Sequence, residues 1–349
     1  MRVARAARQP ARDRLDPADR KLADGVLARE PRALARAITL LESSRRDHQA
    51  RAGQLLETLL PHTGRSFRVG ISGAPGAGKS TFIETLGLFL TGRGHRVAVL
   101  AVDPTSALSG GSILGDKTRM ERLSRDPNAF IRPSPSGGML GGVAHMTREA
   151  MLVCEAAGFD VVIVETVGVG QSETAVAGMT DCFVLVALPN AGDDLQAIKR
   201  GIVELVDVVA VNKADIDRRA AELARTQIAN ALSMLRPHEV ITGEGKGSPA
   251  TYWTAPVVSV SALKSEAIDA FWGECERFRD TLTASGALAA KRRRQALDWM
   301  SALVEHALHA RFYQHPAVKQ ELAAVREAVA EGSMTPAAAA ERLLSAIER

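Results

Sequence analysis

The residues best suited to chemistry lie at positions 73–81, where the sequence reads Gly-Ala-Pro-Gly-Ala-Gly-Lys-Ser-Thr. This is a G-x-x-x-x-G-K-[ST] pattern, whose glycines let successive backbone N–H groups face a polyphosphate. Lys79 is expected to reach the β- and γ-phosphates, and Ser80 to place its hydroxyl on Mg²⁺. A β-like run precedes the loop and a helical pattern follows it. The motif predicts a nucleoside triphosphate site made of Gly73, Ala74, Pro75, Gly76, Ala77, Gly78, Lys79, Ser80 and Thr81.

A second set of polar residues, Asn212-Lys213-Ala214-Asp215, follows an apolar run at 208–211. The Asp215 carboxylate can accept hydrogen bonds from both N1–H and the 2-amino group of guanine, a pair of donors that adenine lacks. Sites that bind such a polar edge reject analogues without it by about 10⁴-fold or more. Lys213 is expected to lie over the base and Asn212 to tether neighbouring loops. This N-K-x-D pattern favours GTP over ATP, and an ordinary polar turn is the alternative.

A third segment, Ser261-Ala262-Leu263, follows the apolar run at 257–260. Ligands of open parallel sheets bind at the carboxyl ends of the strands, where this segment falls together with the two motifs above. We expect its backbone to contact O6 of guanine, and we predict Ser261, Ala262 and Leu263 as GTP-binding residues.

Glu165 ends an apolar run and begins the segment Glu-Thr-Val-Gly. At this position phosphate-loop proteins have an acidic residue in the second shell of the metal. A glycine follows whose backbone N–H contacts the γ-phosphate. In the commonest GTPases the next residue is a Gln that orients the attacking water, but here it is Val169. We therefore expect slow GTP hydrolysis by the isolated protein. Gln171 and Glu173 are candidates for orienting the water, and a polar surface loop explains them equally well.

Two further acids extend the predicted metal region. Asp103 follows the apolar run at 97–102, and Asp116 lies in the Gly-rich stretch 110–119. Such a stretch can order around Mg²⁺ and the γ-phosphate and relax after hydrolysis, which is the behaviour of a switch. An ordinary mobile loop is the alternative.

Short apolar runs that alternate with helical patterns predict the elements that position these residues. The runs are rich in Val, Ile and Leu, as strands buried on both faces of a parallel sheet require. They lie at 67–72, 97–102, 129–132, 161–165, 183–188, 208–211 and 257–260. The predicted fold class is therefore α/β, with a doubly wound, mostly parallel sheet.

Helical patterns flank the predicted sheet on both sides. We expect a disordered basic tail over 1–16, a helical segment over 17–64, the phosphate-loop domain over 65–284 and a helical arm over 285–349. The arm has an apolar stripe but no sheet of its own to cover. Such an arm commonly packs on a second subunit, although packing on its own domain is nearly as favourable.

Composition restricts the classes of partner. The chain has 349 residues and a net charge of +4, and its first 14 residues carry five Arg and one Asp, which account for that surplus. A charge confined to a tail does not indicate a nucleic-acid surface. The three cysteines are far apart, and no apolar run is long enough to cross a bilayer. We expect no nucleic-acid or membrane partner and a bacterial cytoplasmic protein, with the mitochondrial matrix as a minor alternative.

Together these motifs resemble the methylmalonyl-CoA mutase-associated GTPases of the MeaB/ArgK type, within the metal- and cofactor-maturation class of P-loop GTPases. The resemblance covers about residues 20 to 330. The segments at 110–120 and 165–173 are far more specific than the generic phosphate loop. The matching segments lie at 73–81, 102–106, 110–120, 165–173 and 212–215.

The resemblance implies a homodimeric GTPase that acts as the chaperone of an adenosylcobalamin-dependent acyl-CoA mutase, gating cofactor delivery and protecting or reactivating the mutase. It implies Mg²⁺ held by Ser80, Asp103, Asp116 and Glu165, and catalytic roles for Lys79, Glu165 and Lys199. Lys199 belongs to a segment at 188–199 that the resemblance marks as partner-sensing, and a solvated helix lysine is the alternative. No cobalamin site is identified in the sequence.

Three other functions compete with this interpretation. A metal-insertion GTPase of the nickel-maturation class usually carries a His-rich tract or a Cys-based site, whereas the eight His here are scattered. An ATP-dependent P-loop kinase is disfavoured by the N-K-x-D pattern. The third alternative, a purely structural dimeric scaffold, would not bind nucleotide.

Overall fold

The computed structural model describes residues 11–43, 45–102, 120–132, 140–166, 172–189, 204–234, 238–240 and 251–347. The chain divides into two compact units, Met1–Ala290 and Lys291–Arg349, each with its own internal packing. The sequence motifs that predict nucleotide binding all belong to the first unit.

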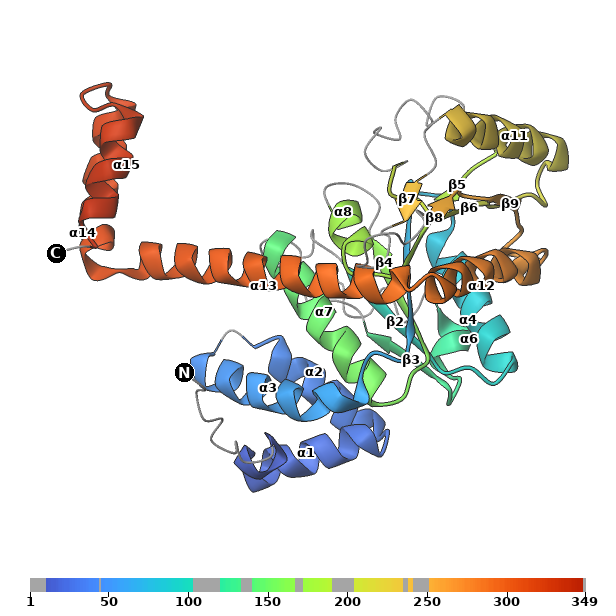
Figure 1. The fold of residues 1–349 in the computed structure, drawn as a ribbon, viewed down its shortest axis with the longest axis horizontal. Helices are drawn as coiled ribbons and strands as arrows, with labels where there is room; N and C mark the ends of the chain where they lie inside the picture. The colour runs from blue at the N-terminus through green and yellow to red at the C-terminus, as the bar shows by residue number, and fades with distance from the viewer. Residues whose placement is uncertain are drawn as a thin grey trace. The chain divides into compact units, whose positions relative to one another are not determined.

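A seven-stranded, entirely parallel sheet forms the centre of the first unit (Figure 1). Strands β4 and β5 are buried at every position, and this explains their near-continuous Val, Ile and Leu content. The α/β prediction is confirmed, and each strand of the sheet was predicted from an apolar run. In the order β3-β2-β4-β1-β5-β6-β9, the strands span Ala129–Arg132, Val97–Val102, Val161–Thr166, Phe67–Gly73, Cys182–Ala187, Val208–Val211 and Val257–Ser259.

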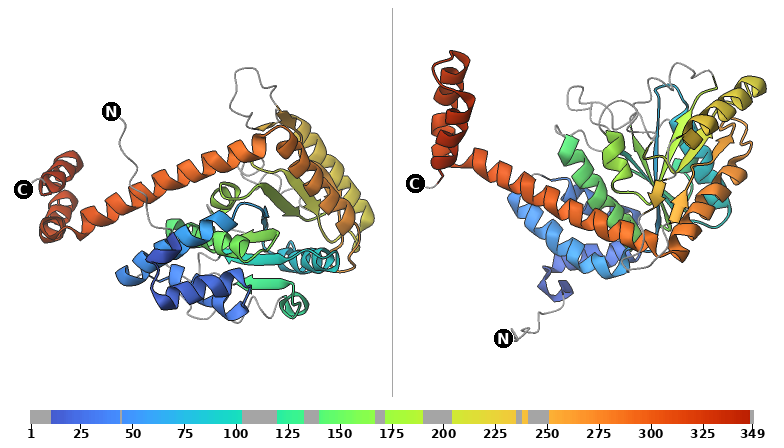
Figure 2. Two further views of the ribbon diagram at one scale, coloured as in Figure 1. Left: turned by 60° about the horizontal axis from the view of Figure 1, so that its bottom comes forward. Right: turned by 45° about the horizontal axis from the view of Figure 1, so that its top comes forward.

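Helices cover both faces of this sheet (Figure 2), so each face contributes to a separate hydrophobic core. One face packs against α4 (Lys79–Gly92), α6 (Glu121–Ser124) and α12 (Ile268–Ala284). Aromatic rings fill this core. Phe82 of α4 packs edge to face on Phe271 of α12, with 5.0 Å between the ring centroids. The other face packs against α7 (Leu140–Ala156), α8 (Ser172–Ala177) and α11 (Arg218–Met234).

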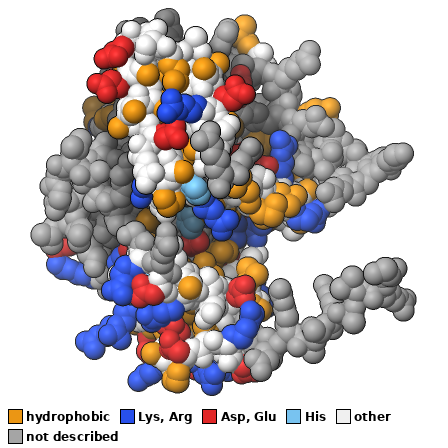
Figure 3. Space-filling view, turned by 90° about the vertical axis from the view of Figure 1, so that its left-hand side faces the viewer, with side chains coloured by type: hydrophobic (Ala, Val, Ile, Leu, Met, Phe, Trp, Pro, Cys, Tyr) orange, Lys and Arg blue, Asp and Glu red, His pale blue; other side chains and the backbone are white. Residues whose placement is uncertain are grey.

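Three N-terminal helices pack outside α7 and extend the second core. They are α1 (Pro17–Leu27), α2 (Pro31–Leu41) and α3 (Arg46–Leu59). Proline at the start of α1 and α2 suits the first helical turn, where no backbone donor is needed. Their outer surface mixes both signs of charge (Figure 3), with ion pairs such as Arg12–Asp24 and Arg14–Glu57. Ion pairs of this kind neutralise part of the positive charge near these helices.

One element has no counterpart among the predicted strands. Strands β7 (His238–Val240) and β8 (Thr251–Trp253) form a small antiparallel sheet. Trp253 attaches it to the main sheet, because its indole Nε1 donates to the backbone oxygen of Asp207 at 2.8 Å. Three-residue strands are too short to show the alternation on which a prediction would depend.

The second unit is wholly helical in its described residues. It contains the continuation of α13 (Ala287–Gln314), followed by α14 (Pro316–Ala330) and α15 (Pro336–Ser345). Helices α14 and α15 pack on each other, and the Arg342 guanidinium lies 2.7 Å from the Glu321 carboxylate. The predicted helical C-terminus is confirmed.

Candidate nucleotide-binding site

The predicted phosphate loop connects the end of β1 at Gly73 to the start of α4 at Lys79. Gly73 lies so close to β5 that a Cβ atom there would be 2.3 Å from the backbone oxygen of Val186. Gly78 has a left-handed backbone (φ +82°), and a Cβ atom there would be 2.8 Å from Nδ2 of Asn212. Both positions therefore require glycine. The loop leads into the N-terminus of α4, where free N–H groups and the helix dipole favour an anion.

Lys79 is buried, and its side chain folds back over the loop. Its Nζ donates to the backbone oxygens of Gly73 at 2.7 Å and Ala74 at 3.2 Å. Burial lowers the pKa of this ammonium group, and the carboxylates of Glu165 and Glu173 oppose that effect. The cation is thus held within reach of the space above the loop, where a phosphate can replace the two carbonyl partners.

Ser80 and Glu165 come together at the carboxyl end of β4. The Ser80 hydroxyl donates to Oε1 of Glu165 at 3.0 Å, and the Glu165 side chain is buried. On the opposite face of the sheet, Thr166 donates its hydroxyl to that of Ser72 at 2.9 Å. This bond fixes the end of β4 to the end of β1, directly before the phosphate loop.

The side chain of Asn212 joins two loops that are far apart in sequence. Its Nδ2 donates to the backbone oxygen of Ala77 in the phosphate loop at 2.9 Å. Its Oδ1 accepts from the backbone N–H of Ala262 at 3.0 Å. Asn212 is almost completely buried, with 2% of its surface exposed, so both bonds are protected from water. These two bonds therefore tie the phosphate loop and the 261–263 loop to the end of β6.

The Asp215 carboxylate is oriented by a hydrogen bond from Ser261 in the neighbouring loop. Ser261 donates its hydroxyl to Oδ1 of Asp215 at 2.6 Å and accepts from the backbone N–H of Lys264 at 3.1 Å. The hydrogen bond from Ser261 lowers the pKa of Asp215, which keeps the carboxylate charged and able to accept. Lys213 has a left-handed backbone (φ +63°), a strained conformation for a residue with a side chain.

The structure thus brings together the phosphate loop, Glu165, the 212–215 motif and Ser261 with its two successors at one edge of the sheet. Leu263 is largely exposed there. Three predicted site residues, Asp103, Asp116 and Lys199, lie outside the described residues, as do Val169 and Gln171.

Some contacts of this region were not predicted from the sequence. Nothing in the sequence marks Ser72 as the partner of Thr166, because both are ordinary strand residues until the sheet pairs β1 with β4. The burial of Glu173 is also unexpected for a residue that a polar surface loop would explain equally well.

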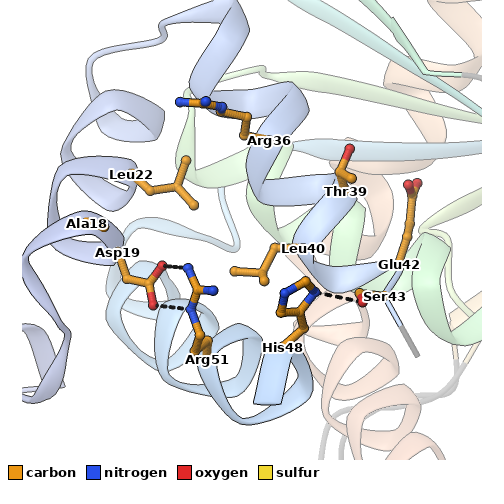
Figure 4. Close-up of a pocket in the computed structure, with 10 residues that line it drawn as sticks. All are labelled: Ala18, Asp19, Leu22, Arg36, Thr39, Leu40, Glu42, Ser43, His48 and Arg51. Atoms are coloured by element: carbon orange, nitrogen blue, oxygen red, sulfur yellow. Dashed lines mark hydrogen bonds and ion pairs between the residues drawn. The ribbon is translucent and has the colours of Figure 1, made fainter. Parts of the chain in front are cut away.

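A cavity of about 660 Å³ lies elsewhere, among the N-terminal helices (Figure 4). Asp19 and Arg51 form a two-bond ion pair at one side of it, with bonds of 2.9 and 2.7 Å. The His48 ring meets the Ser43 hydroxyl at 2.8 Å at the other side. None of its lining residues comes from the four segments at the carboxyl edge of the sheet, so this cavity is separate from the candidate nucleotide site.

Comparison with known proteins decides the family. The family model described as "Methylmalonyl Co-A mutase-associated GTPase MeaB" matches residues 34–317. The chain belongs to the MeaB family. It is therefore a P-loop GTPase of that family, and the phosphate loop and the N-K-x-D motif both fall inside the matched range.

Individual relatives of this MeaB-family chain extend over nearly all of it. A Caulobacter vibrioides protein named as a GTPase is 53% identical over 337 residues, covering 97% of this chain and 98% of the relative. The mouse protein "Methylmalonic aciduria type A homolog, mitochondrial" is 43% identical over 94% of this chain and 79% of its own length. A solved structure titled "Crystal structure of LAO/AO transport system kinase" matches with a TM-score of 0.73 and 35% identity, covering 96% and 99% of the two chains.

Two further observations concern only the residues that the structure describes. No helix among them is both long enough and apolar enough to span a membrane. Within the same ranges, His, Cys, Asp and Glu side chains form no group of three that could hold a metal ion.

The contact between Asp215 and Ser261 leads to a test of base recognition. Asp215→Asn replaces an acceptor by an amide whose NH₂ can donate to the 2-oxo group of xanthine. We expect preference to shift from GTP toward XTP by about 100-fold or more, measured by competition for a fluorescent nucleotide. Asp217→Asn is the matched control, because Asp217 caps α11 through the N–H of Ala220 and Asn caps equally well. Unchanged selectivity in Asp215→Asn would remove this residue from base recognition.

Proposed function

We propose that this GTPase is the chaperone of an adenosylcobalamin-dependent acyl-CoA mutase of the methylmalonyl-CoA mutase type. In this role it gates delivery of the cofactor and protects or reactivates the mutase. Membership of a family described as methylmalonyl-CoA mutase-associated carries the proposal. The mouse relative, whose name refers to methylmalonic aciduria, supports it.

In this proposal GTP binds at the carboxyl ends of the parallel strands. Residues 73–81 hold the phosphates, with Lys79 moving from its two carbonyl partners to the β- and γ-phosphates. Asp215 accepts from the guanine N–H groups, Lys213 covers the base, and the 261–263 backbone faces O6. The charged Asp215 carboxylate supports GTP over ATP, because adenine would leave this acceptor unmatched.

Mg²⁺ fits the donors at the phosphate end of this site. The Ser80 hydroxyl and the Glu165 carboxylate are hard oxygen ligands 3.0 Å apart, of the kind that Mg²⁺ prefers. Together with Asp103 and Asp116 they would hold the ion. When bound, Mg²⁺ neutralises charge on the β- and γ-phosphate oxygens.

Hydrolysis by the isolated protein is slow in this proposal, because Val169 replaces the Gln that orients water in the commonest GTPases. Lys79 and Glu165 act at the phosphates, and Lys199 supports stimulation by the partner. GTP is then hydrolysed rapidly only while the mutase is bound. We assign the protein to the bacterial cytoplasm.

The mutase partner is tested by kinetics with purified components. We expect the rate of GTP hydrolysis to rise by about tenfold or more when an adenosylcobalamin-dependent mutase from the same organism is added at saturating concentration. A cobalamin-independent acyl-CoA enzyme from the same organism serves as the control. A high basal rate that no mutase changes would contradict the chaperone role and leave the GTPase activity itself intact.

An exposed apolar stripe on helix α13 supports the proposal of a homodimer. Helix α13 exposes Leu297, Met300, Val304 and Leu308, with 53–61% of each residue accessible. Their spacing of three or four residues places them on one face of the helix. An exposed apolar stripe of this length is typical of a surface that packs against another chain. We propose that a second copy of this protein covers it.

The homodimer is tested by changing this stripe without touching the nucleotide site. Val304→Asp combined with Leu308→Asp places two charges in the proposed interface, and their burial would cost several kcal/mol. We expect a dimer for the unmodified protein and a monomer for the variant in size-exclusion chromatography with light scattering. Glu305→Gln in the same turn is the control. A variant that remains dimeric would show that the stripe is not the interface.

A further inference from the structure

Glu173 is a buried carboxylate at the start of α8. Only 5% of its surface is exposed, although it lies in the first turn of a six-residue helix. Burial of a charged carboxylate is costly unless a partner compensates it. Negative charge is favoured at a helix N-terminus, but the effect of one short helix is modest. The position of the side chain must therefore be explained by what it faces.

The packing of α8 places Glu173 near the carboxyl edge of the sheet, where the phosphate loop also lies. Helix α8 lies against β1, β4 and β5, and Val176 packs so tightly on β1 that a Cβ atom at Gly70 would be 2.8 Å from its Cγ1. Only five residues separate Ser172, where α8 begins, from Thr166, where β4 ends. The first turn of α8, which carries Glu173, therefore lies toward the carboxyl ends of the strands. Its charge accordingly acts on the Lys79 ammonium group.

Glu165 and Glu173, whose charges both act on Lys79, differ in their hydrogen bonds. Glu165 already accepts a hydrogen bond from Ser80, the residue that also defines the predicted metal position. Among the described residues, no side chain or backbone group donates a hydrogen bond to Glu173. One carboxylate is thus committed to Ser80, whereas the other accepts no hydrogen bond from the described residues.

We infer that Glu173 accepts a hydrogen bond from the water that attacks the γ-phosphate and so supplies the orienting group that Val169 cannot. The water oxygen donates an electron pair to the γ-phosphorus as the bond to the β,γ-bridging oxygen breaks, and GDP leaves with that electron pair. The proton of the water passes through the Glu173 carboxylate to the phosphate that is released. The step involves no oxidation or reduction, and it adds a catalytic residue to the GTPase reaction.

The test compares Glu173→Gln with the unmodified protein under single-turnover conditions with excess enzyme. The amide keeps the size of the side chain but is a much poorer proton acceptor, so hydrolysis should slow by about 100-fold. Affinity for a non-hydrolysable GTP analogue should be retained or increased, because the change removes a negative charge near the phosphates. Glu222→Gln on the exposed face of α11 is the matched control, and it should leave both quantities unchanged.

Unchanged hydrolysis in Glu173→Gln would overturn the inference. Parallel losses of hydrolysis, analogue affinity and melting temperature would also overturn it, because they indicate a purely structural role. If Glu173→Gln does not fold, Glu173→Asp carries the same test, since it keeps the charge but retracts it by one methylene group. That variant should hydrolyse GTP about tenfold more slowly with analogue affinity retained, and an undiminished rate would again overturn the inference.

Discussion

The two hydrogen bonds of the Asn212 side chain are the constraint on which the candidate site depends. They join the backbone of Ala77 to that of Ala262 through one buried amide. An amide suits this place because it donates and accepts at once. A carboxylate would leave the Ala77 oxygen unpaired, and an aliphatic side chain would leave both backbone groups unpaired. Gly78 completes the constraint, since any side chain there would collide with the amide nitrogen. The distance between the phosphate end and the base end of the site is thereby fixed before any nucleotide arrives.

The two ends of this site are built differently. At the base end, the Ser261 hydroxyl fixes Asp215 through one oxygen of its carboxylate, and it also accepts from the backbone N–H of Lys264. At the phosphate end, Lys79 is held by carbonyl groups that a phosphate can replace, and the buried Glu173 acts on its charge. Rigid recognition of the base and adjustable contacts at the phosphates suit the partner-dependent hydrolysis that we propose.

Much of this organisation could be predicted from the sequence, because the motifs carry their own physical requirements. The phosphate loop needs glycines at fixed positions and a strand and a helix on its two sides, so β1 and α4 follow from the pattern. The parallel sheet follows from runs of Val, Ile and Leu that only strands covered on both faces require. The contact between Asn212 and Ala77 is less direct, since the sequence predicts a tether but not its partner atoms.

Other features depend on tertiary packing and leave no local signal. The Thr166–Ser72 bond exists because β4 pairs with β1, and neither residue type indicates it. The close approach of α8 to β1 depends on Gly70, where the absence of a side chain leaves room for Val176, and the burial of Glu173 in the same helix likewise has no local signal. The β7–β8 sheet is attached through Trp253, which packs on Phe278 and donates to the Asp207 backbone, rather than marked by a strong strand pattern.

One buried amide makes the phosphate loop and the base loop a single rigid binding surface. Calorimetric titration of Asn212→Ala with GDP tests this role of Asn212. We expect GDP affinity to fall by about tenfold or more, because two buried backbone groups lose their partner and the two loops are no longer fixed together. The melting temperature without nucleotide should change by only a few degrees. A folded variant that binds GDP as tightly as the unmodified protein would show that the amide does not organise the site.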